Sequence, residues 1–498
     1  MENSEQARNS SDTSNLYRLL PSVNDLLLSP DVAALLQVHS RSAVLDSSRA
    51  VLLRVKQQIA DGQHTQGSLT MLLSSLNLAV ADELRHAAQF SLRRVINATG
   101  VILHTNLGRA PLSASALERI RQTAAGYSNL EFDLESGERS PRDTHAEQLL
   151  LRLLKTKVGA MIGEMAETPR AAVVVNNCAA ATFLALNSIA EGTEVLVSRG
   201  ELVEIGGGFR IPEILAKSGA RMREVGTTNR TRLADYESAI SPETGLILRV
   251  HQSNFSIEGF AARPALDELV SLARRRKIPL FDDQGTGLLF SLDDLGVRSE
   301  PTLLDSFRFG SDLIAASGDK LLGGPQCGLL VGRVDLIERI RKNPLLRTFR
   351  VDKLTYAALE ATLMDHLIDR ADSIPIVKIL HATSGEISQR CERIAVHLIS
   401  DSLSAKVVAV QSLIGGGTAP AARLKSSAVA LRHRSLSPQA LLLALRRLDP
   451  PIIGRISDNN VLLDLRTVEP EFDAKLISLL EQLAQGTNGS DPLAPGGN

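Results

Sequence analysis

Cysteine is scarce in this chain of 498 residues, and tryptophan is absent. The three cysteines, Cys178, Cys327 and Cys391, stand far apart, with no Cys-x-x-Cys pair and no cluster of cysteine with histidine. A disulfide framework and a structural zinc site both need such clusters, so neither is expected. We therefore expect a protein that holds no metal.

Long apolar runs are also missing. No run reaches the ~18–20 residues that a membrane-spanning helix needs. The first fifteen residues are polar and lack the apolar segment of a secretory signal. These features predict a cytoplasmic protein without a membrane partner. The net charge of −1 gives no sign of nucleic-acid binding, which a strongly basic chain would give.

The hydrophobic pattern divides the chain into three domains and two polar ends. Leucines at three- and four-residue spacing predict a helical N-terminal domain over residues 16–94. Strand-like runs alternate with amphipathic helices over 95–370, which predicts an α/β domain with a mostly parallel sheet flanked by helices. Shorter strands predict a small α+β domain over 371–485. The lead 1–15 and the tail 486–498 are expected to be disordered. The strands expected in the large domain are 171–175, 194–198, 245–251, 278–283 and 312–317.

One lysine stands among glycines where an apolar strand is expected to end. In ASGDKLLGGPQCGLL (316–330), Lys320 follows Ser-Gly-Asp and precedes Leu-Leu-Gly-Gly-Pro. Glycines let the backbone approach a flat cofactor closely. An aldehyde cofactor needs a lysine whose amine is partly neutral, which burial or a nearby cation can achieve. Taken alone, the segment fits an ordinary surface lysine in a turn at least as well.

Two further segments suit the same cofactor. IPLFDDQGTG (278–287) ends in Asp282 and Asp283, either of which could pair with a pyridine nitrogen, and we favour Asp282 because it ends the apolar run. An ordinary turn is the alternative. In VVVNNCAAATFLALN (173–187), backbone N–H groups of Asn177, Cys178 and Ala179 could hold a phosphate at a helix N-terminus. Asn177 could also be a simple N-cap. Phosphate cup, ring carboxylate and lysine occur in an order that suits pyridoxal phosphate.

Two glycine clusters need a separate interpretation. EIGGGFRIPEI (204–214) and LIGGGTAPA (413–421) lack the strand and helix context of a dinucleotide site. We predict that both are tight turns and that one lies near the lysine.

Several long segments resemble the family of bacterial L-seryl-tRNA(Sec) selenium transferases, also called selenocysteine synthases. They lie in order between about residues 95 and 430: VINATGVILHTNLGRAPLS (95–113), YSNLEFDLESGERSPR (127–142), SRGELVEIGGGFRIPEI (198–214), VGTTNRTRLADYE (225–237), RVHQSNFSIEGF (249–260), SGDKLLGGPQCG (317–328) and IGGGTAPAARL (414–424).

The resemblance implies a fold-type-I pyridoxal phosphate transferase in which Lys320 binds the cofactor covalently. It implies conversion of L-seryl-tRNA(Sec) to L-selenocysteinyl-tRNA(Sec), with selenophosphate as donor and a dehydroalanyl intermediate on the cofactor. It also implies a homo-oligomer, a ring of dimers, whose N-terminal domain helps to hold the tRNA. Asp319, next to the lysine, could orient the amine or carry protons.

Four arginines in the matching segments are candidates for holding the donor: Arg109, Arg142, Arg347 and Arg350. Selenophosphate is a small polyanion, and the planar guanidinium group makes paired, charge-assisted bonds to phosphate oxygens. The resemblance points to this set as the donor site. Arg347 and Arg350 lie in a basic stretch, so contact with tRNA phosphates and a plain solvated surface are the alternatives.

His104 and His251 lie in matching segments, and one of them could stack on the cofactor ring. We favour His251, with a hydrogen-bonded structural histidine as the alternative. For RNA contact the N-terminal domain offers Arg85, Arg93 and Arg94 with His86, which could also be ordinary helix-end cations.

Two other functions are compatible with parts of the sequence. A pyridoxal phosphate lyase acting on a free small molecule would not need the N-terminal domain and the four arginines together. An RNA-binding protein without catalysis would not need Lys320 and Asp282.

Overall fold

The computed structural model describes residues 14–88, 90–159, 169–297, 300–398, 400–420 and 422–486. It forms two compact units that divide between Arg94 and Val95. The expected disordered ends lie almost entirely outside the described residues. No helix in the described part is long and apolar enough to cross a membrane.

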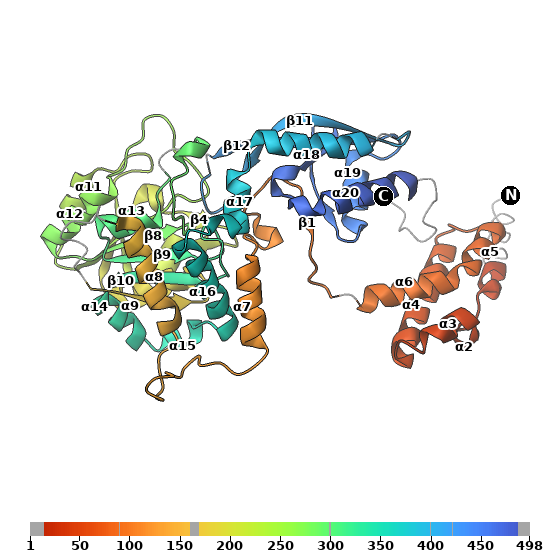
Figure 1. Cartoon of the computed structure of the whole chain (residues 1–498), viewed down its shortest axis with the longest axis horizontal. Coiled ribbons are helices and arrows are strands. Elements are labelled where there is room, and N and C mark those ends of the chain that lie inside the picture. Colours follow the sequence, from red (N-terminus) through yellow and green to blue (C-terminus); the bar gives the residue numbers. More distant parts are fainter. Residues whose placement is uncertain are drawn as a thin grey trace, which may run out of the picture. The chain divides into compact units, whose positions relative to one another are not determined.

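The first unit is a group of helices around its own apolar core (Figure 1). Hydroxyl side chains of Ser22, Ser40 and Thr65 cap three of these helices by accepting backbone N–H bonds. Arg85 and His86 lie in the last turn of α6 (Leu76–Ala88), the last helix of this unit, which agrees with the alternative that they are helix-end cations. The helices are α2 (Val23–Leu28), α3 (Pro30–Leu35), α4 (Arg41–Ala60), α5 (Gln66–Ser74) and α6 (Leu76–Ala88).

The second unit contains a seven-stranded sheet in the order β2-β10-β9-β8-β7-β3-β6. Only β10 runs antiparallel to its neighbours, so the predicted mostly parallel α/β sheet is confirmed. The strands are β2 (Arg170–Val175), β3 (Glu194–Ser198), β6 (Arg221–Val225), β7 (Thr244–Val250), β8 (Leu280–Gly285), β9 (Leu313–Ser317) and β10 (Gly328–Arg333). β6 and β10 are not among the strands expected from the sequence.

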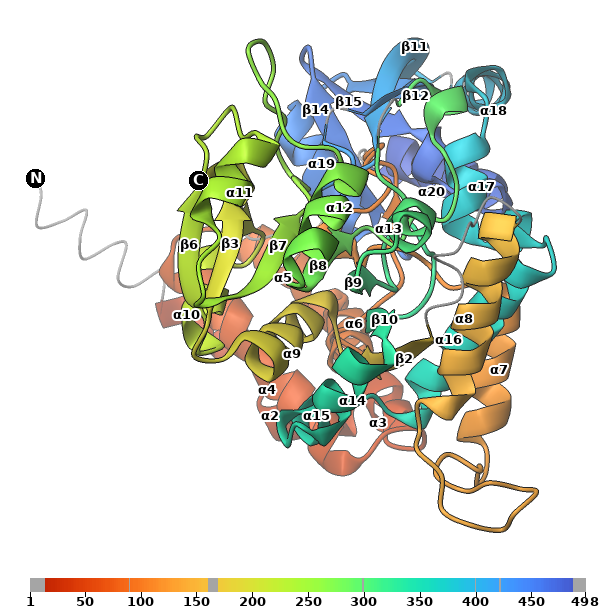
Figure 2. The same cartoon turned by 90° about the vertical axis from the view of Figure 1, so that its left-hand side faces the viewer.

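Helices cover both faces of this sheet (Figure 2). Strand side chains on one face pack against α9 (Cys178–Ala190), α10 (Ile211–Lys217) and α14 (Val334–Lys342). The other face packs against α8 (Thr144–Val158), α12 (Leu266–Arg276), α13 (Leu303–Phe309) and α16 (Lys353–Leu367). Burial on both sides explains why the central strands are almost wholly apolar. The ends of the parallel strands then form one edge at which polar residues collect.

The C-terminal part of this unit is a smaller sheet in the order β11-β12-β15-β14. Its helices share one apolar core with it. β1 (Ile96–Asn97) pairs with β13 (Ile452–Ile453), so the first residues of the unit join this smaller part. The strands are β11 (Leu403–Leu413), β12 (Arg423–His433), β14 (Arg455–Ser457) and β15 (Asn460–Asp464); the helices are α18 (Ser384–His397), α19 (Pro438–Arg447) and α20 (Asp473–Gly486).

Candidate active site

Lys320 lies in the turn after β9, and its side chain is buried. Its Nζ donates a hydrogen bond of 2.6 Å to the carbonyl oxygen of Gly417, in the second glycine cluster. A Cβ on Gly318 would lie 2.5 Å from the Cys327 sulfur, so only glycine lets the chain turn this tightly. The lysine segment and the glycine cluster, almost a hundred residues apart in sequence, therefore meet at one amine.

Burial lowers the pKa of Lys320, because an ammonium group loses its water of hydration there. The charge of Arg109 lowers this pKa further, while nearby acidic groups, Asp283 and Asp319 among them, oppose the shift. The net shift is downward, so the neutral amine, which is the nucleophilic form, is more populated than in a free lysine.

Asp319 is fixed beside the lysine by two donors. Arg109 Nη1 lies 2.7 Å from one carboxylate oxygen, and Ser317 Oγ lies 2.7 Å from the other. Arg109 has a left-handed backbone (φ 58°) and donates its own N–H to the His104 carbonyl. The structure thus places Arg109 beside Lys320, apart from the other three arginines of the predicted donor set.

The two aspartates of β8 point to opposite faces of the sheet, as neighbouring strand residues must. Asp283 accepts hydrogen bonds from Thr182 of α9 at 3.0 Å and from the Cys178 thiol at 3.7 Å. Asp282 instead accepts one from Ser306 of α13 at 2.6 Å. Burial raises the pKa of both carboxyl groups, that of Asp283 to about 6. The geometry favours Asp283 as the carboxylate facing the lysine, which corrects the preference for Asp282.

α9 begins beside this carboxylate. The Asn177 side chain accepts the N–H of Ala180 at 2.8 Å, so Asn177 is the N-cap. The N–H groups of Cys178 and Ala179, in the first turn, have no acceptor within the helix. Free N–H groups at a helix N-terminus are suited to bind an anion. Capping and anion binding, posed as alternatives from the sequence, are compatible because they use different atoms.

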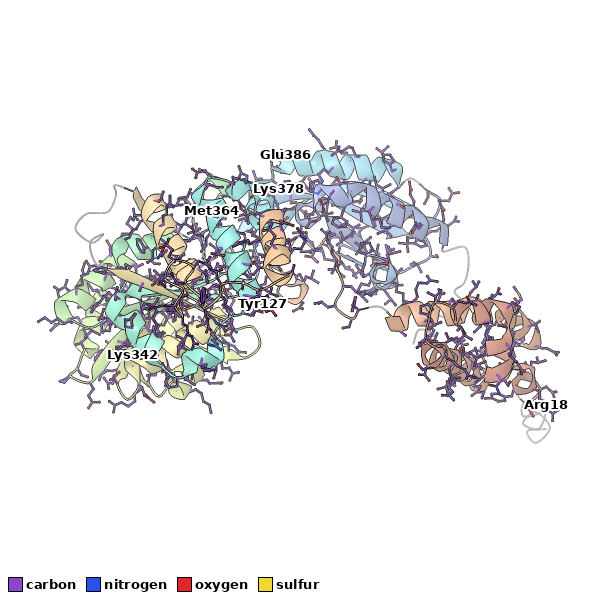
Figure 3. All side chains as sticks on the ribbon, turned by 60° about the horizontal axis from the view of Figure 1, so that its bottom comes forward. Arg18, Tyr127, Lys342, Met364, Lys378 and Glu386 are labelled. Atoms are coloured by element: carbon purple, nitrogen blue, oxygen red, sulfur yellow. The ribbon has the colours of Figure 1, made fainter. Side chains whose placement is uncertain are left out.

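The remaining three arginines line one pocket of about 590 Å³. Glu131 stands among them: Arg142 Nε lies 2.6 Å from its carboxylate, and Arg350 Nη1 lies 3.5 Å away. Hydrogen bonds from Arg142 and Arg139 lower the pKa of Glu131, which therefore stays charged. The basic lining is Arg139, Arg142, Arg341, Lys342, Arg347 and Arg350, with Lys342 at the end of α14 (Figure 3).

This basic pocket adjoins the start of α9. The Asn176 N–H donates to the Phe349 carbonyl at 2.8 Å, and Val175 forms a bridge with Arg350. Arg350 is therefore attached to the chain just before the N-cap Asn177. Sequence reasoning missed Glu131, Arg139 and Arg341 in this pocket. Arg139 and Glu131 lie in a segment used for the resemblance, but nothing in their spacing shows that they meet.

The two candidate histidines have different surroundings. His251 Nε2 lies 2.9 Å from Glu300 Oε1, and its side chain is on the face of Asp282. This geometry fits the structural alternative better than ring stacking beside Lys320. His104 lies in the segment that carries Arg109, and its buried Nδ1 has no hydrogen-bond partner among the described residues.

The sheet is mostly parallel, a buried lysine follows β9, the neighbouring strand β8 carries a buried carboxylate, and a capped helix begins beside it. This arrangement is typical of the fold-type-I class of pyridoxal phosphate enzymes. The solved structure of a D-glucosaminate-6-phosphate ammonia-lyase supports this fold, with a TM-score of 0.54 at 19% identity over 80% of this chain and 97% of that chain.

Sequence comparison narrows the class to one family. The family model described as L-seryl-tRNA selenium transferase matches residues 95–469, and that of the selenocysteine synthase N terminus matches 17–54. The L-seryl-tRNA(Sec) selenium transferase of Geobacter sulfurreducens is 41% identical over 94% of this chain and 99% of that protein. The enzyme of that name from Aquifex aeolicus is 42% identical over 88% and 94%. The chain belongs to the L-seryl-tRNA selenium transferase family, and the resemblance seen in the sequence is confirmed.

Proposed function

We propose that the protein converts L-seryl-tRNA(Sec) to L-selenocysteinyl-tRNA(Sec), using selenophosphate and pyridoxal phosphate bound at Lys320. The single observation that carries this proposal is the buried amine of Lys320, near the carboxylates of Asp319 and of Asp283 in β8, in a chain of this family. A tRNA substrate also agrees with the expected cytoplasmic location.

The residues present fit the proposed cofactor. Asp283 is a buried carboxylate close to Lys320, and a protonated pyridine nitrogen would supply it with a stronger counter-charge. The first turn of α9, at Asn177, Cys178 and Ala179, offers N–H groups for a phosphate. When bound, the cofactor supplies an electron sink for charge that develops at the substrate α-carbon.

Lys320 carries the proton chemistry in this proposal. Once the substrate amine replaces it, the freed amine can take the α-proton, since burial favours its neutral form. The Gly417 carbonyl holds the amine in place before that exchange. Asp319 is a positioning residue, since Arg109 and Ser317 fix both of its oxygens beside the lysine.

We propose the basic pocket as the donor site. Arg142, Arg347 and Arg350 can bind a polyanion through several N–H groups at once. Glu131 holds Arg142 and Arg350 in fixed orientations and offsets part of their charge, which keeps the site ordered without a ligand. Arg109 lies beside Lys320 and outside this pocket, so it can contact selenophosphate only where the selenium reaches the substrate.

The direct test uses cofactor-loaded protein, seryl-tRNA(Sec) labelled in the serine and selenophosphate. The expected product is labelled selenocysteine attached to the tRNA. Label that stays as serine on the tRNA, together with turnover of a free amino acid, would contradict the proposal and favour the small-molecule lyase.

We further propose a homo-oligomer, in line with the ring of dimers that the resemblance implies. One segment supports an interface because it carries exposed apolar side chains: Tyr127, Phe132 and Leu134. Tyr127 is fully exposed; it is labelled in Figure 3. Exposed apolar clusters of this kind are typical of protein interfaces. Sedimentation of the purified protein would show a mass several times that of one chain; a monomer would contradict this.

A further inference from the structure

We propose that a second pocket binds the 3′-terminal nucleoside of the aminoacylated RNA; this rests on the proposed function. The pocket has a volume of about 670 Å³, within the range of small-ligand sites. It is distinct from the basic pocket. The lining residues used in the argument are Glu201, Arg230, His251, Phe255, Glu300 and Pro420.

The position of this pocket suits the substrate. Ala419 and Pro420 form part of its wall, and they follow closely on Gly417, whose carbonyl accepts the Lys320 Nζ bond. Two residues span at most about 7 Å of chain. The wall therefore begins close to the amine. A serine bound at Lys320 through its amino group carries its ester-linked ribose at the other end, and that ribose must occupy an adjoining space.

The polar groups of the pocket favour a neutral ligand with hydroxyl groups. Glu201 is buried: its Oε2 accepts the Val250 N–H at 3.1 Å, while its Oε1 lies 3.1 Å from Arg249 Nε in an ion pair and accepts no hydrogen bond among the described residues. Glu300 lies against His251. His251 is buried, and its Nδ1 has no hydrogen-bond partner among the described residues. A buried polar atom without a partner is rare and needs an explanation, and at the wall of a pocket a ligand contact supplies one. Glu201 and Glu300 balance the charges of Arg230 and Arg263 in the lining, so this pocket lacks the excess positive charge with which the basic pocket can bind a polyanion such as the selenium donor.

Aromatic and cationic groups complete the site. Phe255 lines the pocket and is 37% exposed. The Arg230 guanidinium lies 4.4 Å from the ring centroid of Phe260, which is 76% exposed. Proteins bind single-stranded RNA by stacking bases on aromatic rings and on arginine planes. Arg263, also at the pocket and exposed, can meet the phosphate that precedes the terminal nucleoside.

The test measures steady-state kinetics of the full-length, cofactor-loaded protein with two variants, Phe255→Ala and Glu300→Gln. Each should raise the KM for seryl-tRNA(Sec) about tenfold, the effect expected from loss of one base-stacking or ribose contact. The kcat and the KM for selenophosphate should change little. Glu258→Gln is the matched control, because Glu258 is exposed in the same loop and does not line the pocket. Because Glu300→Gln keeps the shape of the side chain, it still tests the prediction if the Phe255→Ala protein does not fold.

Adenosine is the second probe. It should compete with seryl-tRNA(Sec) but not with selenophosphate, and both variants should weaken its binding in calorimetry. An active parent whose variants keep the parental KM, or raise only the KM for selenophosphate, would overturn the nucleoside site and leave the proposed function intact. A parent that binds adenosine at this pocket but forms no selenocysteine would support the site and overturn the proposed function.

Discussion

A lysine amine becomes nucleophilic near neutral pH only when its charged form is made unfavourable. At Lys320 burial lowers the pKa of the amine, and the charge of the nearby Arg109 lowers it further. Arg109 is in turn bound to Asp319, so one ion pair both shapes the electrostatics of the amine and fixes the neighbouring carboxylate. The chemistry at this residue thus depends on groups from three distant parts of the chain, including the carbonyl of Gly417.

Gly417→Ala tests the contact with the lysine. An added Cβ would lie 3.1 Å from Lys320 Nζ, on a backbone with φ +86° that disfavours side chains. We expect a loss of about tenfold or more in kcat/KM and a destabilisation of about 1 kcal/mol. Gly416→Ala is the control, because its nearest neighbour would be a methyl carbon of Thr105 at 4.0 Å. Equal activities of the two variants would contradict the assigned contact.

Asp283→Asn tests the buried carboxylate through pH. The pKa of Asp283 rises from 3.8 to about 6 on burial, so between these values the folded, cofactor-free protein binds more protons than the unfolded chain. Its free energy of unfolding therefore falls as pH rises through this window and is constant above it. In the variant, the decrease in the free energy of unfolding across this pH window should be smaller by about 1–3 kcal/mol. Urea titrations at several pH values measure it; equal slopes for parent and variant would contradict the shift.

The sequence proposed Lys320 and Asn177 through the concurrence of three segments and the family resemblance, because each local pattern alone also fits an ordinary turn or N-cap. It could not choose between Asp282 and Asp283. That choice depends on which face of β8 packs against α9, and this is set by long-range packing. The division of the arginines has the same cause: Arg109 lies with Asp319, while Arg142 and Arg350 meet at Glu131.

Among the elements, α9 links the fold to the site. Its apolar residues pack on the sheet, and its first turn presents N–H groups beside Asp283. The strands expected from the sequence were short, mostly apolar runs bounded by helix-like segments. β6 was missed because Arg221, Arg223 and Glu224 interrupt it at the sheet edge. β10 is an apolar run, but it follows the lysine turn without an intervening helix and so does not fit the expected alternation of strand and helix.

Asn177→Ala separates capping from cofactor binding. Loss of the cap should cost about 0.5–2 kcal/mol in the free energy of unfolding. It should also weaken pyridoxal phosphate binding, because the first turn of α9 would lose its fixed orientation. Ser437→Ala removes a cap from α19 in the smaller sheet and should cost similar stability with no change in cofactor affinity. Equal cofactor affinities in the two variants would argue against a phosphate site at α9.

Arg347→Ala and Arg350→Ala test the basic pocket. Loss of one charge-assisted contact should raise the KM for selenophosphate by roughly tenfold or more, with little change in the KM for seryl-tRNA(Sec). Arg275→Ala, at an exposed position of α12, is the control. A larger effect on the tRNA than on selenophosphate would favour the tRNA-contact alternative for these arginines.

On the scale of the whole molecule, the candidate cofactor residues and the N-terminal helices belong to different units. All residues placed around Lys320 belong to the unit Val95–Gln485, and the residues before Val95 have a core of their own. We propose that the N-terminal unit serves RNA binding, as the resemblance implies. The sequence predicted this division from the change in hydrophobic period, but not the pairing of β1 with β13.

A protein that begins at Val95 tests this division. It should bind pyridoxal phosphate with unchanged affinity, because no candidate cofactor residue is removed. Its affinity for seryl-tRNA(Sec) should fall by at least tenfold in a filter-binding assay. Unchanged RNA affinity would show that the N-terminal unit has another role.

The central claim is that Lys320 is the residue that binds the cofactor. Borohydride reduction of the loaded protein, followed by peptide mapping, tests it most directly. We predict a pyridoxyl adduct on Lys320 and none in Lys320→Ala. An adduct on a different lysine, or a Lys320→Ala protein that still makes selenocysteine on tRNA, would contradict the account.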